Sequence, residues 1–257
     1  MKTQCKYCFD GTCDTCDGKE TVERVLKPTV RITTKCTQSC DHCCFSCSPK
    51  RHDMMTVEQA RKVAGFLRKY EIRYINVMGG EFFCNPYWEE IFYLLIKEVM
   101  VMRLVTNGDW AENEEVKEKL KKFLTHDESK HIYLCISGDK WHDLENTEKA
   151  LEWLKKNDLK GKVGKMEDRA VVPVGRGWAH STFYSSMGCY CRSKDNRYDF
   201  LIDEEGNVYK CPFGLLKIFN VGDDSKDFFE KFKTINKRMQ DIFIPSCKAC
   251  VRALMGV

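Results

Sequence analysis

The stretch TTKCTQSCDHCCFSC, residues 33–47, holds five cysteines, at positions 36, 40, 43, 44 and 47. Three kinds of structure use thiols at such density: disulfide frameworks, zinc sites and iron–sulfur clusters. Each kind requires different surroundings for the stretch. The remainder of the sequence therefore decides which of the three this protein builds, and which fold carries it.

The bulk composition is that of an ordinary folded protein. The chain has 257 residues, 43% of them hydrophobic, which is enough to bury the core of one large domain or of one domain with a small appendage. Its formal net charge of +4 is spread among many residues of both signs. This distribution differs from the dense basic surface of a dedicated nucleic-acid binder, but it is compatible with an acidic substrate.

The N-terminal residues bear on the compartment in which the protein works. MKTQCKYCFDGTC contains no apolar signal segment, and no run in the chain approaches the ~18 apolar residues that a membrane-spanning helix needs. We therefore expect a cytoplasmic protein without a membrane partner. Sixteen cysteines in such a chain argue against a disulfide framework, because cytosolic thiols are kept reduced. Binding of metal ions or clusters is the preferred explanation, and redox catalysis comes second.

Short apolar runs alternate with amphipathic segments through the middle of the chain. This alternation is typical of βα units and of a mainly parallel sheet. Five or six such units would make an open or closed α/β barrel. The predicted strands are residues 29–34, 73–78, 101–106, 131–137 and 170–174, and the predicted helices are residues 56–70, 86–99, 112–124 and 145–157.

The pattern changes after residue 185. YDFLIDEEGNVYKC, residues 198–211, reads as two short strands around an acidic turn that contains glycine, which predicts a β-hairpin. An amphipathic helix is expected around residues 225–240. We therefore divide the chain into a cysteine-rich metal-binding segment (1–27), an α/β core (28–185) and a small C-terminal domain (186–257).

Three cysteines follow directly on the first predicted strand. Cys36, Cys40 and Cys43 have the spacing CxxxCxxC, and loops that follow barrel strands form the face on which active sites lie. Three thiolates on one loop can hold three irons of a [4Fe–4S] cluster and leave the fourth iron open for chemistry. Cys40, Cys44 and Cys47 repeat the spacing further from the strand, so we favour the first register. A zinc knuckle built from two CxxC pairs is the alternative.

The spacing resembles the signature of the radical S-adenosylmethionine (SAM) superfamily, in which an aromatic residue precedes the third cysteine. Three further motifs, each at the end of a predicted strand, resemble family elements in the family's order: NVMGGEFF, LVTNGDW and CISGDKWHD. Together they argue against the zinc knuckle. The residues that this resemblance assigns to SAM binding are His42, Gly79, Gly80, Glu81, Thr106, Asn107, Ser137 and Asp139.

The resemblance implies a partial (βα)6 TIM-like barrel and reductive cleavage of SAM to a 5′-deoxyadenosyl radical, which abstracts a hydrogen atom from the substrate. Gly79 and Gly80 would let the backbone approach the methionine portion closely, and the Glu81 carboxylate would pair with its ammonium. Arg176, in VVPVGRGWAH, resembles a GRA-like element close to cofactor and substrate. A surface arginine after a glycine turn is the alternative. Trp141 and His142 would face the same opening, with packing as their default role.

The C-terminal cysteines resemble the auxiliary-cluster extension called SPASM or, in its shortened form, twitch. Only VRALMGV follows Cys250, so the twitch form with one auxiliary [4Fe–4S] cluster fits better, and a four-cysteine zinc site is the alternative. Cys189 could replace one ligand, lie inertly in the core, or donate a hydrogen atom to a substrate radical, which would imply an epimerase. The expected ligands are Cys191, Cys211, Cys247 and Cys250.

The N-terminal cysteines Cys5, Cys8, Cys13 and Cys16 have the spacing CxxCxxxxCxxC. Four thiols at this spacing can close a tetrahedral zinc site that folds a segment too small to bury a core. A further cluster is the second interpretation, and an exposed tag with free thiols is the third.

The substrate is not encoded by these motifs. We favour a peptide or protein, modified as in the maturation of ribosomal peptides by cross-linking or epimerisation, with flavodoxin or ferredoxin as electron donor. The alternatives are a dehydrogenase of a small molecule such as a sugar or cyclitol, in which the second cluster accepts an electron, and a non-catalytic zinc protein that binds nucleic acid. The cysteines without an assigned role are Cys44, Cys47, Cys84 and Cys135.

Overall fold

The computed structural model of the protein describes residues 25–125, 131–159, 161–164, 175–179, 197–211 and 213–223, together with 228, 230, 231 and 234. Five strands lie side by side in chain order, each parallel to the next. This confirms a mixed α/β fold with a parallel sheet. The strands are β1 (Val25–Arg31), β2 (Tyr74–Met78), β3 (Val101–Thr106), β4 (His131–Ser137) and β5 (Gly161–Gly164).

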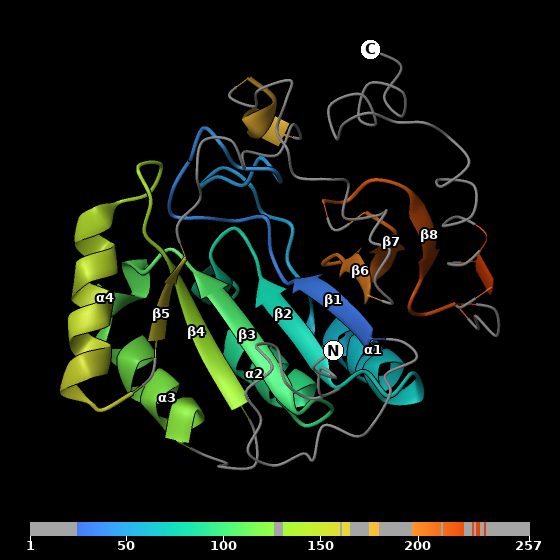
Figure 1. Ribbon diagram of the computed structural model, residues 1–257, viewed down its shortest axis with the longest axis horizontal. Helices are drawn as coiled ribbons and strands as arrows, with labels where there is room; N and C mark the ends of the chain where they lie inside the picture. Colours follow the sequence, from blue (N-terminus) through green and yellow to red (C-terminus); the bar gives the residue numbers. More distant parts are fainter. Residues whose placement is uncertain are drawn as a thin grey trace, which may run out of the picture.

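One helix follows each of the first four strands: α1 (Val57–Lys69), α2 (Trp88–Ile96), α3 (Glu114–Thr125) and α4 (Leu144–Lys156). They lie where the periodicity predicts them, and three begin at side-chain caps: the Thr56 hydroxyl accepts from the Gln59 amide (3.1 Å), the Asn113 side-chain oxygen from the Val116 amide (3.1 Å), and the Asp143 carboxylate from the Glu145 amide (3.0 Å). Figure 1 shows α1, α2 and α3 behind the sheet and α4 beside its β5 edge.

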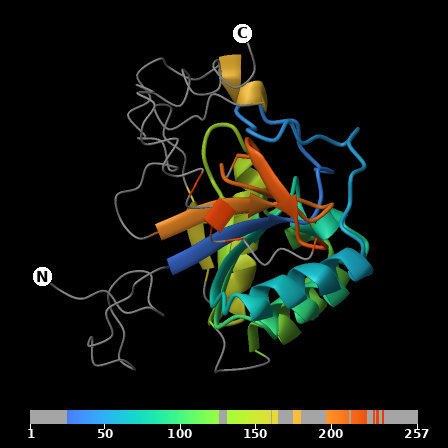
Figure 2. The same ribbon diagram turned by 90° about the vertical axis from the view of Figure 1, so that its right-hand side faces the viewer.

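The two faces of the sheet differ in composition. On β2 the buried residues Ile75 and Val77 alternate with the half-buried Tyr74, Asn76 and Met78. Successive side chains of a strand point to opposite faces, so the apolar set packs against the helices in the main core. Figure 2 shows α1 along this side of the sheet. Tyr74, Asn76 and Met78 lie on the opposite face, here called the inner face of the sheet.

The C-terminal strands extend the same sheet. β6 (Arg197–Ile202) runs parallel to β1, pairing from Val25↔Arg197 to Val30↔Ile202, and β7 (Asn207–Tyr209) returns antiparallel to β6. The predicted hairpin is therefore present, and β8 (Lys217–Asn220) follows it at the sheet's edge. The predicted boundary at residues 185–186 lies outside the described residues, but the strands on either side of it share one sheet.

Two aromatic contacts show how the C-terminal segment joins the core. Phe228, a described helical position within the predicted helix 225–240, is fully buried. Its ring lies 5.4 Å from Phe66 on α1 and 5.5 Å from Phe219 on β8, measured between ring centroids. Aromatic pairs at this separation add to the apolar burial that holds elements together.

The strand predictions differ from the structure at two places. β1 begins at Val25, four residues earlier than expected, and β5 is the short GKVG segment rather than residues 170–174, which lie outside the described residues. GKVG has two glycines and one β-branched residue, so strand propensity could not indicate it. None of the helices in the described ranges has the length and apolar content to cross a bilayer.

Candidate functional site

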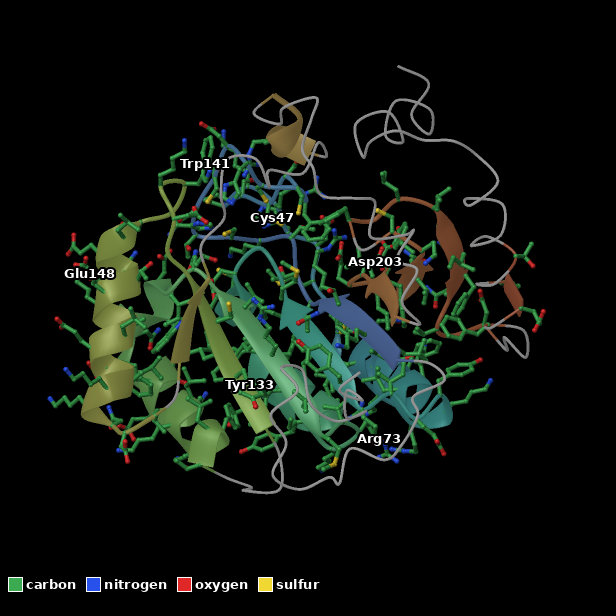
Figure 3. All side chains as sticks on the ribbon, viewed as in Figure 1. Cys47, Arg73, Tyr133, Trp141, Glu148 and Asp203 are labelled. Atoms are coloured by element: carbon green, nitrogen blue, oxygen red, sulfur yellow. The ribbon has the colours of Figure 1, made fainter. Side chains whose placement is uncertain are left out.

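The segment that follows β1 forms a loop, here called the thiol loop, residues 36–47. A short bridge pairs Lys35 with Ser48 at its base, where the Cys36 amide donates to the Ser48 carbonyl (3.2 Å). Inside the loop, the Cys43 amide donates to the Cys40 carbonyl (3.1 Å). The loop therefore starts and ends at the carboxyl end of β1. Figure 3 shows Cys47 and Trp141 above the strand ends, with Arg73 at the opposite end of the sheet.

The thiols of Cys36, Cys40 and Cys43 lie close enough to affect one another's ionisation. Burial raises the pKa of Cys36 to about 12, assisted by the charges of Glu81 and of the other two thiols, and burial likewise raises the pKa of Cys40 to about 11. Such thiols ionise when a bound metal replaces the proton. The Asn107 side-chain amide lies 3.8 Å from the Cys36 sulfur and is a weak donor to it.

Cys47 supports Cys43 and lies outside the first register. Its thiol hydrogen bond is the main cause that lowers the pKa of Cys43 to about 6, and its backbone amide lies 3.3 Å from the Cys43 sulfur. Sharing this hydrogen bond raises the pKa of Cys47 itself. Burial raises the pKa of Cys44, with smaller contributions from the charges of Cys43 and Cys211. The Cys44 thiol thus lies near enough to Cys211, which follows β7, for the two charges to interact.

Gly79 and Gly80 allow the end of β2 to pack directly on the base of the thiol loop. The Gly80 amide donates to the Thr33 carbonyl (2.8 Å), and a Cβ on Gly80 would lie 2.2 Å from the carbonyl oxygen of Lys35. A Cβ on Gly79 would lie 2.7 Å from the Thr33 methyl. The sequence suggested close approach to a ligand as the reason for these glycines. The structure supplies a packing reason, since any side chain here would displace the loop.

Glu81 joins the second and third motifs. Its carboxylate is buried, with 2% of the residue exposed, and accepts hydrogen bonds from the Thr106 hydroxyl (2.8 Å) and the Asn107 amide (2.8 Å). Burial raises the pKa of Glu81 to about 7, although these hydrogen bonds act in the opposite direction. A carboxylate in this setting gains from a cationic ligand, because an ammonium would offset the cost of burying its charge.

Asp109 is a site residue that the motif reading missed. Its carboxylate accepts from the side-chain amides of Gln38 in the thiol loop (2.9 Å) and of Asn146 on α4 (2.6 Å). It begins the short 3-10 turn η2 (Asp109–Glu112), which follows Gly108 at φ +92°. The signal was the aspartate directly after Thr-Asn-Gly, where a left-handed glycine turns the chain back toward the loop.

The end of β4 brings a polar and aromatic cluster to the third cysteine. The His42 ring stacks on Trp141 (centroids 5.4 Å apart) and meets the edge of His142 (4.9 Å), and His142 Nδ1 lies 2.8 Å from the Asp139 carboxylate. His42, Asp139 and His142 could also hold a divalent cation, since their ligand atoms lie within 4.8 Å of one another. The Ser137 carbonyl accepts from the Thr147 hydroxyl (2.6 Å) and so anchors α4.

Arg176 binds the backbone of the thiol loop. It lies in the 3-10 turn η4 (Gly175–Ala179), where its amide donates to the Cys43 carbonyl (3.1 Å) and its guanidinium donates to the carbonyls of Cys40 (3.0 Å) and Cys47 (2.6 Å). Gly175, at φ +58°, lies so close that a Cβ would be 2.5 Å from the Cys44 carbonyl oxygen. The sequence placed Arg176 beside cofactor and substrate, whereas these hydrogen bonds engage its guanidinium with the loop.

Of the remaining cysteines, three lie within the described residues and the others lie outside them. Cys211, one of the predicted auxiliary ligands, is buried just after β7, and Cys84 is half-buried in the turn η1 (Phe82–Cys84). Cys135 is buried on β4 and accepts a hydrogen bond from Arg103 (3.0 Å). The other predicted ligands lie outside the described residues, and so does Cys189. These ligands are Cys5, Cys8, Cys13, Cys16, Cys191, Cys247 and Cys250.

Known proteins similar to this chain share its central region. The family described as the radical SAM superfamily matches residues 30–172. YydG of Bacillus subtilis (strain 168), whose name assigns it provisionally to peptide biosynthesis, is 30% identical over 116 residues, which are 44% of this chain and 35% of YydG. The chain thus spans about a third of that relative.

Two further comparisons extend over most of the chain. An S-adenosylmethionine-dependent nucleotide dehydratase of Thermoplasmatales archaeon (strain ISO4-H5) is 25% identical over 232 residues, or 86% of this chain and 75% of that protein. The crystal structure of BtrN in complex with AdoMet and 2-DOIA superimposes with a TM-score of 0.62 at 15% identity, covering 84% of this chain and 87% of that one. The latter match shows a common fold.

Proposed function

The chain belongs to the radical SAM superfamily, and from this we propose that it reductively cleaves SAM at a [4Fe–4S] cluster bound by Cys36, Cys40 and Cys43 and abstracts a hydrogen atom from its substrate. Family membership implies the cluster and SAM as cofactors. The observation that carries the proposal is the meeting of three mutually interacting thiols with the buried Glu81 carboxylate at neighbouring strand ends. When bound, a cluster held by three thiolates supplies an open iron and the electron for cleavage.

The side chains around the thiols divide the work of holding SAM. The Glu81 carboxylate, kept in place by Thr106 and Asn107, would receive the ammonium of the methionine portion. The ring faces of His42 and Trp141 would pack against the adenine, and Asp139 would accept from the ribose hydroxyls. Gly79 and Gly80 would act indirectly, because they let the end of β2 pack against the thiol loop that holds the cluster.

We propose a peptide or protein substrate, modified by cross-linking or epimerisation, with flavodoxin or ferredoxin as electron donor. The relationship to YydG supports this. A small-molecule substrate is the second candidate, because the nucleotide dehydratase matches 86% of this chain and 75% of its own length. In either case Cys211, with Cys191, Cys247 and Cys250, would bind one auxiliary cluster for electron transfer. The four N-terminal cysteines would bind zinc, and Cys189 would serve as hydrogen donor only in the epimerase.

Anaerobic reconstitution tests the proposal. Wild-type protein should become brown, bind iron and sulfide, and form 5′-deoxyadenosine from SAM when a chemical reductant is added. Cys36→Ala, Cys40→Ala and Cys43→Ala should each abolish 5′-deoxyadenosine formation. Cys84→Ala is the matched control, since this half-buried thiol lies in η1 outside the thiol loop. Activity that persists in the three variants would contradict the proposal.

The substrate class needs a separate readout. Candidate peptides and nucleotides carrying deuterium at carbon are supplied to the reconstituted enzyme, and deuterium is measured in the 5′-deoxyadenosine formed. Transfer from a peptide supports the first candidate, and transfer from a nucleotide supports the second. Because the label moves only when the radical meets its substrate, background cleavage of SAM does not affect the result.

A further inference from the structure

The inner face of the sheet carries a row of polar side chains across three strands. Asn76 on β2 pairs with Arg103 on β3, and Arg103 pairs with Tyr133 on β4. The residues that precede and follow Arg103, Met102 and Leu104, are fully buried in the core on the helix side. A buried packing face would be apolar, so this row points to another use. Its sequence signal is the single arginine within VMRLVT.

Arg103 is held in place by side chains of the two neighbouring strands, β2 and β4. Its Nη2 donates to the Cys135 sulfur (3.0 Å), and the Tyr74 side chain is a second hydrogen-bond partner. Tyr74 in turn donates to the Asn76 side-chain oxygen (2.9 Å). Burial lowers the pKa of Arg103, but its hydrogen bonds outweigh this and the pKa lies above the ordinary value, so the guanidinium keeps its charge.

The described part of the chain offers Arg103 no carboxylate partner. Arg31, on the same inner face of β1, shows the contrast: its guanidinium pairs with the Glu204 carboxylate at 2.8 and 3.2 Å and lies over the Phe45 ring. Among the described residues no carboxylate offsets the charge of this half-buried cation, which makes it costly to maintain, and two hydrogen-bond partners leave donors of the five-donor guanidinium to spare. An anion from outside the chain would complete this arrangement.

The position of Arg103 suits a substrate more than a cofactor. It lies three residues before Thr106, whose hydroxyl contacts Glu81 at the strand end, so it is ~10 Å below the proposed SAM site along the strand. Tyr133, which pairs with Arg103, is labelled in Figure 3 well below Cys47 and Trp141. Lys27 lies on the same face, its Nζ 5.3 Å from the Tyr74 ring centroid.

We propose that Arg103 binds an anionic group of the substrate, a phosphate or a carboxylate, on the inner face of the sheet. Tyr74 and Cys135 orient the guanidinium so that its remaining donors face the anion, which suits bidentate binding. Cys135 thereby acts as a hydrogen-bond acceptor and not as a metal ligand. The inference rests on the proposed function, because it requires the substrate to enter the barrel beneath SAM.

Calorimetric titration of the cluster-loaded, SAM-bound protein tests the inference with two probes. Pyrophosphate represents a phosphorylated small molecule, and a short acidic peptide, acetyl-Glu-Glu-amide, represents a peptide carboxylate. We expect one probe to bind and thereby to identify the source of the anion. Arg103→Gln should weaken binding of that probe ~10-fold or more. The affinity of Arg103→Lys should lie between those of wild type and Arg103→Gln, because lysine keeps the charge but lacks the planar guanidinium.

Arg73→Gln is the matched control, since Arg73 is exposed at the opposite end of the sheet (Figure 3), and it should bind the probe as the wild type does. Failure of both probes to bind the wild type, or equal binding by wild type and Arg103→Gln, would overturn the inference.

A parallel assay separates this inference from the proposed function. Arg103→Gln should retain its iron content and the slow, substrate-free formation of 5′-deoxyadenosine, because Arg103 contacts neither the thiol loop nor Glu81. If the wild type makes no 5′-deoxyadenosine, the proposed function fails, while anion binding can still be measured. If 5′-deoxyadenosine is formed and Arg103→Gln leaves anion binding unchanged, only the anion site fails.

Discussion

Glu81 combines nearly complete burial with an acidic group whose pKa is close to neutrality. Its residue is 2% exposed and its carboxylate is held by Thr106 and Asn107, so the side chain has one fixed orientation before any ligand arrives. Preorganisation of this kind reduces the cost of binding a cationic group. Burial also makes the ionised form of Glu81 destabilising in the ligand-free protein, because a buried charge is disfavoured.

The raised pKa of Glu81 predicts that the stability of the protein depends on pH. The folded-state pKa of Glu81 is about 7, above the ordinary value of 4.5, so its contribution to stability is fully present below the unfolded-state pKa and is lost as pH rises through 7. The free energy of unfolding of wild type relative to Glu81→Gln should fall by on the order of 2–3 kcal/mol between pH 5 and pH 8. Urea unfolding of the cluster-free chain measures it, and a pH-independent difference would refute the assignment.

Arg176 acts at the same scale through main-chain carbonyls. Its guanidinium hydrogen bonds to Cys40 and Cys47 tie both halves of the thiol loop to one side chain. Each hydrogen bond from a charged donor is worth about 1.5–3 kcal/mol. Its charge also lowers the pKa of Cys40 and of Cys43, although in both cases other causes are larger. The arginine thus favours the ionised thiols that ligation requires.

Replacement of Arg176 should therefore loosen the cluster. We expect Arg176→Ala to release iron to a chelator roughly tenfold faster than wild type under anaerobic conditions, with Arg176→Lys intermediate. Arg61→Ala, at an exposed position of α1, serves as control and should match the wild type. Identical release rates for Arg176→Ala and wild type would show that the loop does not depend on these hydrogen bonds.

At the scale of elements, the site depends on how closely the end of β2 approaches the thiol loop. Gly80 lies where a Cβ would be 2.2 Å from the Lys35 carbonyl oxygen and 2.7 Å from the Cys36 Cβ. Cys36 is the first proposed cluster ligand, and the main-chain atoms of Lys35 beside it cannot move aside as a flexible side chain can. The packing of two elements therefore controls the ligand geometry.

A pair of glycine substitutions tests this packing. Gly80→Ala should displace the thiol loop and reduce bound iron after reconstitution to a small fraction of the wild-type value. Gly65→Ala makes the same chemical change within α1, where nothing lies within 4 Å of the new Cβ, and should stabilise the protein by about 0.5–1 kcal/mol. Iron content and thermal unfolding measure both effects, and normal iron content in Gly80→Ala would contradict the packing argument.

The elements also show what sequence patterns can predict. Four strands and four helices were predictable because hydrophobic period and capping residues such as Thr56 are local signals. The grouping of the motifs was predictable too, since the carboxyl ends of parallel strands meet at one face. The roles of Asp109 and Arg176 were not, because contacts from a side chain to a distant loop leave no periodic trace. β5 was not predicted, because its two glycines are typical of a turn.

At the scale of the whole molecule, one sheet joins the parallel strands β1 to β5 and the C-terminal strands β6 to β8. β6 pairs along β1 (Figure 1), and the Arg31–Glu204 ion pair connects the end of β1 to the β6–β7 turn. Both partners are largely buried, with 13% and 8% of their side chains exposed, so loss of Glu204 would leave a buried charge unpaired. The C-terminal region is therefore part of the core's stability.

Truncation tests this continuity. A chain ending at residue 185 would expose the edge of β1, remove the partner of Arg31 and uncover the apolar surface that Phe228 buries. We expect it to aggregate or to lack a cooperative thermal transition by circular dichroism. A soluble fragment that unfolds at the wild-type temperature would instead show that residues 1–185 fold independently of the C-terminal region.

Electron paramagnetic resonance of the reduced protein tests the central claim most directly. The spectra are recorded in a Cys211→Ala background, to remove the proposed auxiliary cluster, with and without SAM labelled with nitrogen-15 at its amino group. We predict a reduced [4Fe–4S] signal that changes when SAM is added and that shows coupling to the labelled nitrogen, and we predict its loss in Cys36→Ala. A [4Fe–4S] signal that does not change when SAM is added, or that persists in Cys36→Ala, would contradict this claim.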